Sequence, residues 1–565
     1  IKCCCVNALS VFNTSFDSYK AGQSLAQLKD AATGAKDLAQ AANVSATITY
    51  GEQKNIDEST SQSSSASQSK VYAGGKTTIV ATGAGDQSNI NIIGSDVLGV
   101  KGTTLAAEHD VNIKAAEQNS SEQSKNSSLG WNAGVAVSYG SQGASIGVTA
   151  GGNVGKGKGN GEDTSYVNSH VGSKDSQTTI SSGNATNIIG AQVQGKGVKI
   201  TAKDLNVESL QDTATYKSKQ QNVEGQVTAG VGFSASGSLS KSNINANYAA
   251  VNEQSGIFAG DDGYQIKVDK NTDLKGALIT STQKAEDLGK NRLETGTLTS
   301  SNIHNISEYD AKGIGVSGGF SIQGDKPNAK DGATTKPETP QSGFNKNVTG
   351  YNPESSGTNK SVGFGSDSAN DKSTTHSGIN TQNIIIRDEQ AQQQLAGKTA
   401  EQTKQDILTS VTTDNAREHS GALANNFDKD KVQKEINTQV EVTKRFDQNR
   451  QEAKVEINKK MDAVKDQYAE VLAKDKNGEF LSPQEREQLA AYNQKVENYQ
   501  QLGVLLDVVA SGLSAPTNSG LGIATSSLSP VASYEIGQYF KGKGTEGSNA
   551  HILAHTLLGA AVAAA

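Results

Sequence analysis

The sequence is poor in large apolar and aromatic side chains. Of its 565 residues, 34% are hydrophobic and 5% are aromatic, and tryptophan and methionine occur once each. An ordinary globular domain has about 45–50% apolar residues, a figure that includes glycine. A thick core of interlocking side chains is therefore not expected. Another arrangement must order the chain.

Proline is absent from the first 326 residues. The seven prolines are Pro327, Pro337, Pro340, Pro353, Pro483, Pro516 and Pro530. Proline has no amide hydrogen, so it cannot donate to a β ladder or within a helix. Its absence fits a long hydrogen-bonded structure, either a β structure or a helical array.

Cysteine is confined to Cys3, Cys4 and Cys5. A disulfide framework is thereby excluded for the rest of the sequence, which suits an exported protein and equally a cytosolic one. The sequence begins with Ile1 rather than methionine, and we interpret it as a segment of a longer protein.

Charge and apolar runs set two further limits. Lys and Arg total 52 and Asp and Glu total 59, so the net charge is −7, without a dense basic stripe. This balance argues against a nucleic-acid partner. No apolar run reaches the roughly 18 residues of a transmembrane helix. The most apolar stretches, Leu502–Val509 and Ile552–Ala565, are predicted to pack as helices or to contact a membrane when unpacked.

Short strands are indicated before residue 325 by apolar residues that recur with period two. They are Lys76–Val80, Asn89–Ile93, Val111–Ile113, Val198–Ile200, Leu205–Val207 and Ile266–Val268. Glycine, asparagine, aspartate or serine separates them and can turn the chain.

The strands also repeat. Asn89–Val97 aligns with Ala185–Val193 and more loosely with Asn271–Ile279, and a shorter period near twenty residues recurs within the first block. Because stacked coils bury their small inward faces on one another, this pattern predicts a mainly β fold, a parallel right-handed β-helix (solenoid) over residues 46–324. A β-sandwich is the alternative.

Serine-rich stretches beside strands of small residues are interpreted as hairpin excursions from the solenoid. The strands in question are Ala46–Gly51, Gly134–Gly140, Ala229–Ser234 and Gly313–Ser321. Residues 1–45 are expected to be an N-terminal helical or connecting segment.

After residue 324 the composition changes. Residues 325–385 are rich in Lys, Asp, Gly, Ser, Thr and Pro, which predicts a disordered, flexible linker. Residues 386–511 then show helical spacing, as in Val432, Ile436 and Val440, and Ser482–Glu485 has the form of a capping box. Residues 512–565 are predicted to be a further helical segment.

Candidate metal ligands are few. His551 and His555 are spaced i, i+4 on a predicted helix, but the glutamate of an HExxH site is missing, so they are weak candidates only. Asp475–Gly478 and Asp261–Gly263 resemble parts of calcium loops and lack the remaining ligands. Both are interpreted as turns.

Catalytic motifs are also missing. The sequence has no GxGxxG opening a helix, no GxxxxGK[ST] and no GxSxG. We therefore predict no enzyme activity, no catalytic residue and no cofactor. A β-helix enzyme acting on polysaccharides is kept as an alternative of low weight, because a carboxylate pair can form across coils.

Longer motifs carry a family resemblance. GGKTTIVATG at 74–83, TTLAAEHDVNIKAA at 103–116, ESLQDTATYKSKQ at 208–220 and VNEQSGIFAGDDGYQIKV at 251–268 resemble the haemagglutinin repeats of filamentous haemagglutinin-like exoproteins. Residues 512–565 are very similar to the segment before the pretoxin region of contact-dependent growth-inhibition exoproteins.

This resemblance implies a protein of the two-partner (type V) secretion class, exported by an outer-membrane transporter to the surface of a Gram-negative bacterium. It implies a non-catalytic stalk that delivers a C-terminal toxin by contact with a recipient-cell receptor and with the recipient membrane. The family's secretion domain, pretoxin motif and toxin are absent from this sequence, so the toxin and its immunity protein would lie outside it. An adhesin of filamentous haemagglutinin type, mediating attachment, is the alternative.

Overall fold

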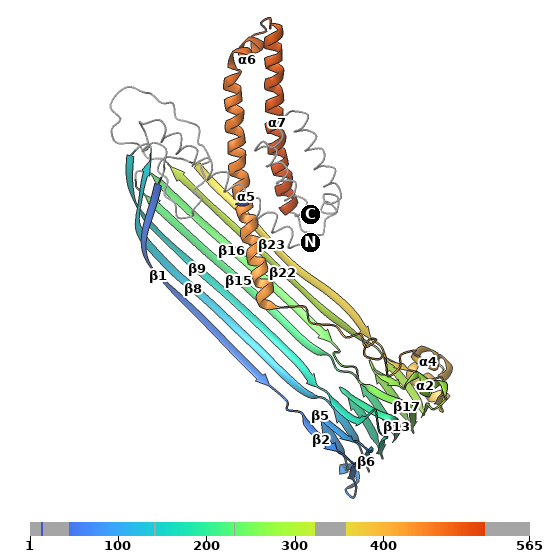
Figure 1. The fold of residues 1–565 in the computed structure, drawn as a ribbon. Coiled ribbons are helices and arrows are strands. Elements are labelled where there is room, and N and C mark those ends of the chain that lie inside the picture. The colour runs from blue at the N-terminus through green and yellow to red at the C-terminus, as the bar shows by residue number, and fades with distance from the viewer. Residues whose placement is uncertain (1–12, 15–43, 141–142, 231, 323–356, 515–565) are drawn as a thin grey trace.

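The computed structural model describes residues 13–14, 44–140, 143–230, 232–322 and 357–514. The protein is mainly β and has three sheets (Figure 1). Two are parallel, with twelve and six strands, and the third is a seven-stranded antiparallel sheet of long strands that projects from them. Most residues of the two predicted segments, 1–45 and 512–565, lie outside the described residues. The candidate metal ligands His551 and His555 lie outside them as well.

The parallel sheets are built from short strands. The twelve-stranded sheet contains β2 (Ser69–Ala73), β3 (Thr77–Ala81), β5 (Ser95–Gly99), β6 (Thr103–Ala107), β10 (Ser169–Ser173), β11 (Thr178–Ser182), β13 (Ala191–Ala202), β17 (Gly256–Val268), β19 (Leu278–Thr280), β20 (Arg292–Thr295), β24 (Gly378–Ile379) and β25 (Ile384–Ile386). The six-stranded sheet contains β4 (Ile90–Ile93), β7 (Val111–Lys114), β12 (Ala185–Ile189), β14 (Asp204–Glu208), β18 (Asn271–Lys275) and β21 (Thr297–Ser301). The six strands predicted from period two are all present.

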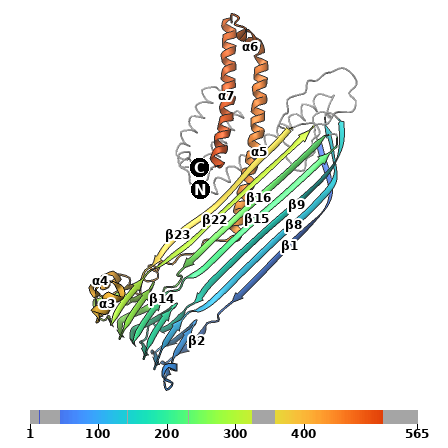
Figure 2. The same ribbon diagram turned by 180° about the vertical axis from the view of Figure 1, so that it is seen from behind.

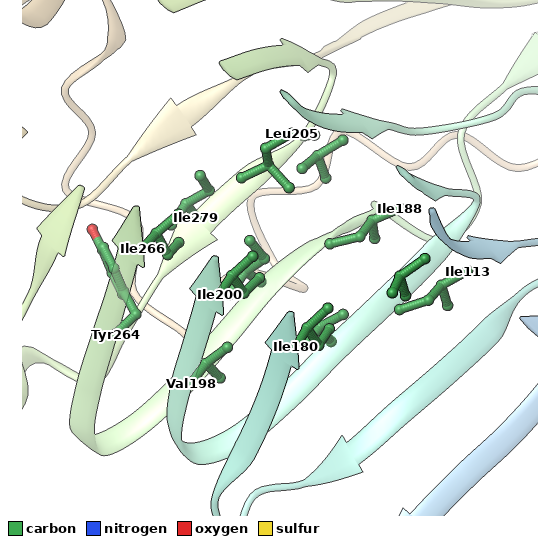
Figure 3. Packing of buried hydrophobic residues seen from close by; sticks show 14 of the residues in the cluster. Ile113, Ile180, Ile188, Val198, Ile200, Leu205, Tyr264, Ile266 and Ile279 are labelled. Atoms are coloured by element: carbon green, nitrogen blue, oxygen red, sulfur yellow. The ribbon is translucent and has the colours of Figure 1, made fainter. Parts of the chain in front are cut away.

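Residues at equivalent positions of successive parallel strands stack on one another. Ile92 pairs with Ile113, Ile113 with Ile188, and Ile188 with Val207. These side chains belong to one continuous buried cluster between the parallel sheets (Figure 3). Each short strand contributes only a few apolar residues, and stacking on the next strand removes them from water. An ordered fold with so little hydrophobic mass follows from this arrangement.

Asparagines form a second ladder beside the apolar one. The Nδ2 of Asn112 donates to Oδ1 of Asn91 at 2.9 Å, and Asn187 donates to Asn112 at 2.8 Å. Asn206 continues the ladder by donating to Asn187 at 2.7 Å. The repeated sequence pattern therefore fixes polar as well as apolar contacts. All pairing described within these two sheets is parallel, which does not fit the sandwich alternative, because such sandwiches are antiparallel.

The long strands are the predicted excursions. They are β1 (Val44–Ser64), β8 (Ala116–Gly140), β9 (Gly143–Val167), β15 (Asp212–Ala229), β16 (Phe233–Ala250), β22 (Ile303–Ile322) and β23 (Gly357–Thr375). Three hairpins leave directly after β7, β14 and β21, strands that are aligned in the six-stranded sheet. The three hairpins all start at the carboxyl ends of parallel strands, so they leave the parallel part on the same side. They therefore pair with one another, in the order β1-β8-β9-β15-β16-β22-β23.

The predicted flexible linker is wrong in its second half. Residues 323–356 lie outside the described residues, but β23 pairs with β22 along its whole length. Side chains of the helix α5 (Lys429–Gln467) accept from the outer amides of β23, as when Phe364 N donates to Thr443 Oγ1 at 2.7 Å and Ser366 N to Gln439 Oε1 at 2.8 Å. Backbone hydrogen bonds thus order a segment that has little apolar surface to bury.

Helices occupy most of residues 389–514, and a further short helix, α2, lies within the parallel part. They are α2 (Gln283–Asp287), α3 (Glu389–Ala396), α4 (Ala400–Ile407), α5, α6 (Ala469–Lys476) and α7 (Pro483–Ser514). Helix α7 begins at the predicted capping box, where Ser482 N donates to Glu485 Oε2 at 2.8 Å. Helix α5 lies across β22 and β23, in front of them in Figure 1 and behind them in Figure 2.

Glycines let α5 approach the sheet closely. A Cβ placed on Gly313 would lie 2.5 Å from Ile436 Cγ2, and one on Gly315 would lie 2.7 Å from Val440 Cγ1. Gly365 faces the same helix, with Ile436 O at 2.7 Å from its added Cβ. The helical spacing noted in the sequence therefore places Ile436 and Val440 on the sheet, while α5 covers one face only.

Candidate functional site

The opposite face of the antiparallel sheet is apolar and exposed. Successive residues of a strand point to opposite faces, so Ile314 and Phe364 point away from α5, whereas their glycine neighbours face it. We call this surface the open face. Its exposed large hydrophobic residues are Ile48, Tyr50, Ile56, Leu129, Trp131, Val135, Ile146, Val148, Val154, Val223, Val227, Phe233, Leu239, Ile314, Phe320, Ile322 and Phe364.

These residues come together through strand register. Ile48 pairs with Val135, and Val135 pairs with Val148, so three strands place branched side chains in one row. The ring centroids of Tyr50 and Trp131 are 6.2 Å apart in an edge-on arrangement. Ile48 is 81% exposed and Tyr50 is 78% exposed. Contiguous exposed apolar surface on this scale marks an interaction site.

The face toward α5 has a different chemistry near the outer ends of the strands. Gln226 Nε2 donates to Thr149 Oγ1 at 2.9 Å, and Thr228 Oγ1 donates to the same oxygen at 3.0 Å. Glycine, serine and asparagine occupy many of the other positions in these rows, including Gly151 and Ser236. Near these outer ends the sheet is therefore amphipathic, with apolar side chains on the open face and polar ones toward α5. Closer to the parallel part, Ile244, Tyr216 and Tyr309 also pack on the α5 side.

Lysines border the apolar rows on the side nearer the parallel sheets. Lys125, Lys156, Lys158, Lys219 and Lys241 line a shallow groove of about 590 Å³ on the open face. In the part of the chain that the structure describes, none of the five forms an ion pair with a carboxylate. The open face thus combines an apolar region with unpaired positive charge.

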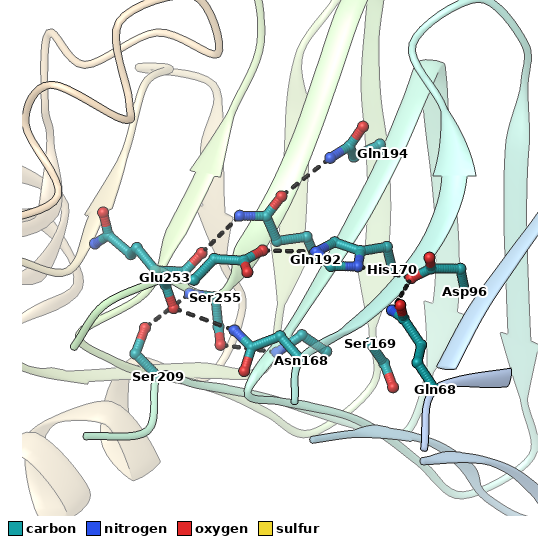
Figure 4. Close-up of polar contacts among 12 residues, drawn as sticks. Gln68, Asp96, Asn168, Ser169, His170, Gln192, Gln194, Ser209, Glu253 and Ser255 are labelled. Carbon is teal, nitrogen blue, oxygen red and sulfur yellow. Dashed lines mark hydrogen bonds and ion pairs between the residues drawn. The ribbon is translucent and has the colours of Figure 1, made fainter. Parts of the chain in front are cut away.

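A polar cluster lies apart from this face, at the base of the hairpins (Figure 4). His170 Nδ1 contacts Asp96 Oδ1 at 2.8 Å, and its Nε2 contacts Glu253 Oε1 at 2.7 Å. Gln68 Nε2 donates to the same Asp96 oxygen at 2.8 Å. The hydrogen bond to Glu253, together with Asp96, raises the pKa of His170 to about 9, although burial opposes the shift. The imidazolium thus bridges carboxylates from separate turns of the chain, which is a structural contact.

This cluster predicts a pH dependence of stability. A raised pKa means that protonated His170 stabilises the folded state fully below about pH 6.5 and that this contribution is lost as pH rises through about 9. We expect H170Q to lower the thermal midpoint by about 2–4 °C at about pH 6, after allowance for solvent screening. The difference from the unmodified protein should shrink by about pH 10. H304Q is the histidine control. A difference in thermal midpoint between H170Q and the unmodified protein that is equal at both pH values would contradict this assignment.

The acidic segment Asp261–Gly263 was predicted to be a turn but lies within strand β17, and lysines of the protein itself contact its carboxylates. Asp261 accepts from Lys284 Nζ at 2.8 Å and from Thr282 Oγ1 at 2.9 Å, and Asp262 lies 3.4 Å from Lys290 Nζ. Within the described ranges, no group of three or more His, Cys, Asp or Glu side chains could hold a metal ion. The described helices include none with the length and apolar character to cross a bilayer.

Comparison with known proteins identifies the family. The hemagglutinin repeat family matches residues 50–223. The chain is 31% identical to the tRNA nuclease CdiA of Yersinia mollaretii over 520 residues, covering 88% of this chain and 15% of that protein. It is 32% identical to the toxin CdiA of Escherichia coli over 409 residues, covering 70% of this chain and 12% of that protein. The chain belongs to the CdiA-like, filamentous haemagglutinin-like proteins.

This CdiA-like chain covers only a small part of the length of its relatives. It spans 15% and 12% of the length of these two curated relatives. A deoxyribonuclease CdiA of Dickeya dadantii is 32% identical over 405 residues, which are 11% of that protein. No solved structure matches the chain.

Sequence reasoning found the hairpins of the CdiA-like chain but not the open face. The signal was present as alternation in Ala46–Gly51 and Gly134–Gly140, where every second residue is larger and more apolar. Assigning these residues to one surface requires the register between strands that are far apart in sequence. The lysine groove was missed for the same reason, because its members come from four strands.

Proposed function

We propose that this CdiA-like chain is a non-catalytic stalk and delivery segment of a secreted cell-surface exoprotein. Its parallel turns form a right-handed β-helix, and its open face contacts the recipient membrane during contact-dependent delivery of a C-terminal toxin. The toxin, the immunity protein and the outer-membrane transporter are partners outside this chain. The names of the relatives, which are nucleases and a toxin, favour this proposal over an adhesin.

The open face is the observation that carries the membrane role. Its apolar residues gain little from facing water, and transfer to an apolar phase is favourable by about 25 cal/mol per Å². Lysines at the border of the apolar region suit an interface where hydrocarbon meets charged headgroups. This surface is the membrane contact that the described residues support. The predicted contact through Leu502–Val509 and Ile552–Ala565 stays a prediction, because Ile552–Ala565 lies outside the described residues.

Trp131 provides a direct test, because it is the one tryptophan in the sequence and lies on the open face. Vesicles of equal parts phosphatidylcholine and phosphatidylglycerol should shift its fluorescence emission to shorter wavelength and carry the protein with them on sedimentation. Failure to sediment with vesicles would contradict the membrane role. Sedimentation with unchanged Trp131 emission would assign the contact to another part of the chain.

A further inference from the structure

Three lysines of the open face lie next to one another on adjacent strands, where their positive charges repel. Lys125 pairs in register with Lys158, and Lys158 pairs with Lys219, so three positive side chains stand directly opposite one another on adjacent strands. Like charges in this position destabilise a sheet. A negative ligand that neutralises them would turn this cost into binding energy.

Neighbouring rows strengthen the local charge. Lys156 and Lys241 both pair with Gln221 in the next row, and they line the same groove as the first three lysines. The one carboxylate that lines the groove is Glu58, opposite Lys125. Five lysines against one glutamate give a positive site on a protein whose net charge is −7.

Lys312 also lies on the open face but differs from the five groove lysines, because it has a carboxylate partner. It lies on the same face, in the row that Lys219 shares with Asn243, and its Nζ is 3.1 Å from Asp310 Oδ1. A nearby carboxylate therefore neutralises Lys312 within its own strand. The five groove lysines have no such partner among the described residues.

The position of the groove indicates the class of ligand. Ile56 lines it, and the row that contains Ile56 also contains Lys156, Lys241 and Ile314. Positive charge and apolar surface therefore meet within a single row of the sheet. A ligand that complements both has clustered negative oxygens attached to hydrocarbon.

We propose that this groove binds the phosphate groups of anionic lipid headgroups when the open face meets a membrane. The proposal rests on the membrane contact proposed above and names the lipid class that the contact selects. Lysine ammonium groups bind phosphate oxygens as compact point charges, and the attraction is strongest within about 10 Å at ordinary ionic strength. The groove would therefore set which membranes are bound, while the apolar rows supply the hydrophobic contact.

The test compares vesicles and matched variants, with Trp131 emission as the readout. The unmodified protein should bind vesicles containing phosphatidylglycerol about tenfold or more tightly than vesicles of phosphatidylcholine alone. K125Q/K158Q/K219Q should remove this preference and leave affinity for phosphatidylcholine unchanged. K101Q/K199Q/K203Q, which removes three exposed lysines from the parallel part, should keep the preference.

Three outcomes would overturn the assignment. Equal affinity of the unmodified protein for both vesicle types would show that the groove selects no headgroup, and an equal loss in both triple variants would show a general charge effect. Displacement by inorganic pyrophosphate at constant ionic strength would assign the groove to soluble phosphate. Failure of the membrane contact itself is distinguishable, because then neither vesicle type would bind.

Discussion

Changing Ile48, Ile146 and Val148 to threonine should weaken binding to phosphatidylglycerol-containing vesicles about a hundredfold. These residues are 81%, 65% and 64% exposed, so most of their apolar surface is still available for transfer out of water. At about 0.8 kcal/mol for each buried methylene group, replacement by threonine removes about 1 kcal/mol per site. A total of about 3 kcal/mol corresponds to about two powers of ten in affinity.

The fold should tolerate this triple change. Threonine keeps the branched Cβ that strands favour, and none of the three side chains is buried in the sheet. Affinity is measured by titrating Trp131 emission with vesicles, and folding by the thermal midpoint. V71T/V80T/V100T is the matched control, because it removes exposed valines from the parallel part. A triple variant on the open face that binds as tightly as this control would refute the role of the apolar rows.

Replacing Ile188 with alanine should produce the largest loss of stability of a single substitution proposed for this chain. Ile188 is fully buried and lies in register with Ile113 (Figure 3). On its other side it pairs with Val207 of the next parallel strand. Its neighbours are held by their own ladders, so they cannot collapse into the space. The expected cost is about 2–5 kcal/mol, as for other buried isoleucines cut back to alanine.

Denaturation by urea, followed by circular dichroism in the β region, measures this effect as a lower midpoint. I93A is the control, because Ile93 ends the equivalent strand β4 and its side chain is 55% exposed. That variant should stay within about 0.5 kcal/mol of the unmodified protein. A midpoint for I188A equal to that of I93A would mean that stacking of successive turns does not hold the parallel part together.

The repeated short strands were predictable because each is a local pattern. Ile90 and Ile92 alternate with polar residues in the same way as Val111 and Ile113, and the two pairs lie in register in the structure. The start of α7 was predictable for the same reason, since a capping box involves residues three apart. Such features depend on spacing along the chain, which the sequence contains in full.

Two features depended on contacts between segments far apart in sequence. The segment that forms β23 has few apolar residues and was expected to be flexible, yet β22 and α5 satisfy its backbone on both sides. The open face needs β1, β8, β9, β15, β16, β22 and β23 in one register before its apolar residues and lysines become neighbours. Composition and periodicity determined which segments are strands, because they act within a few residues. The order, register and common face of the hairpins were decided by the tertiary structure, because all the hairpins leave the parallel part at the same edge.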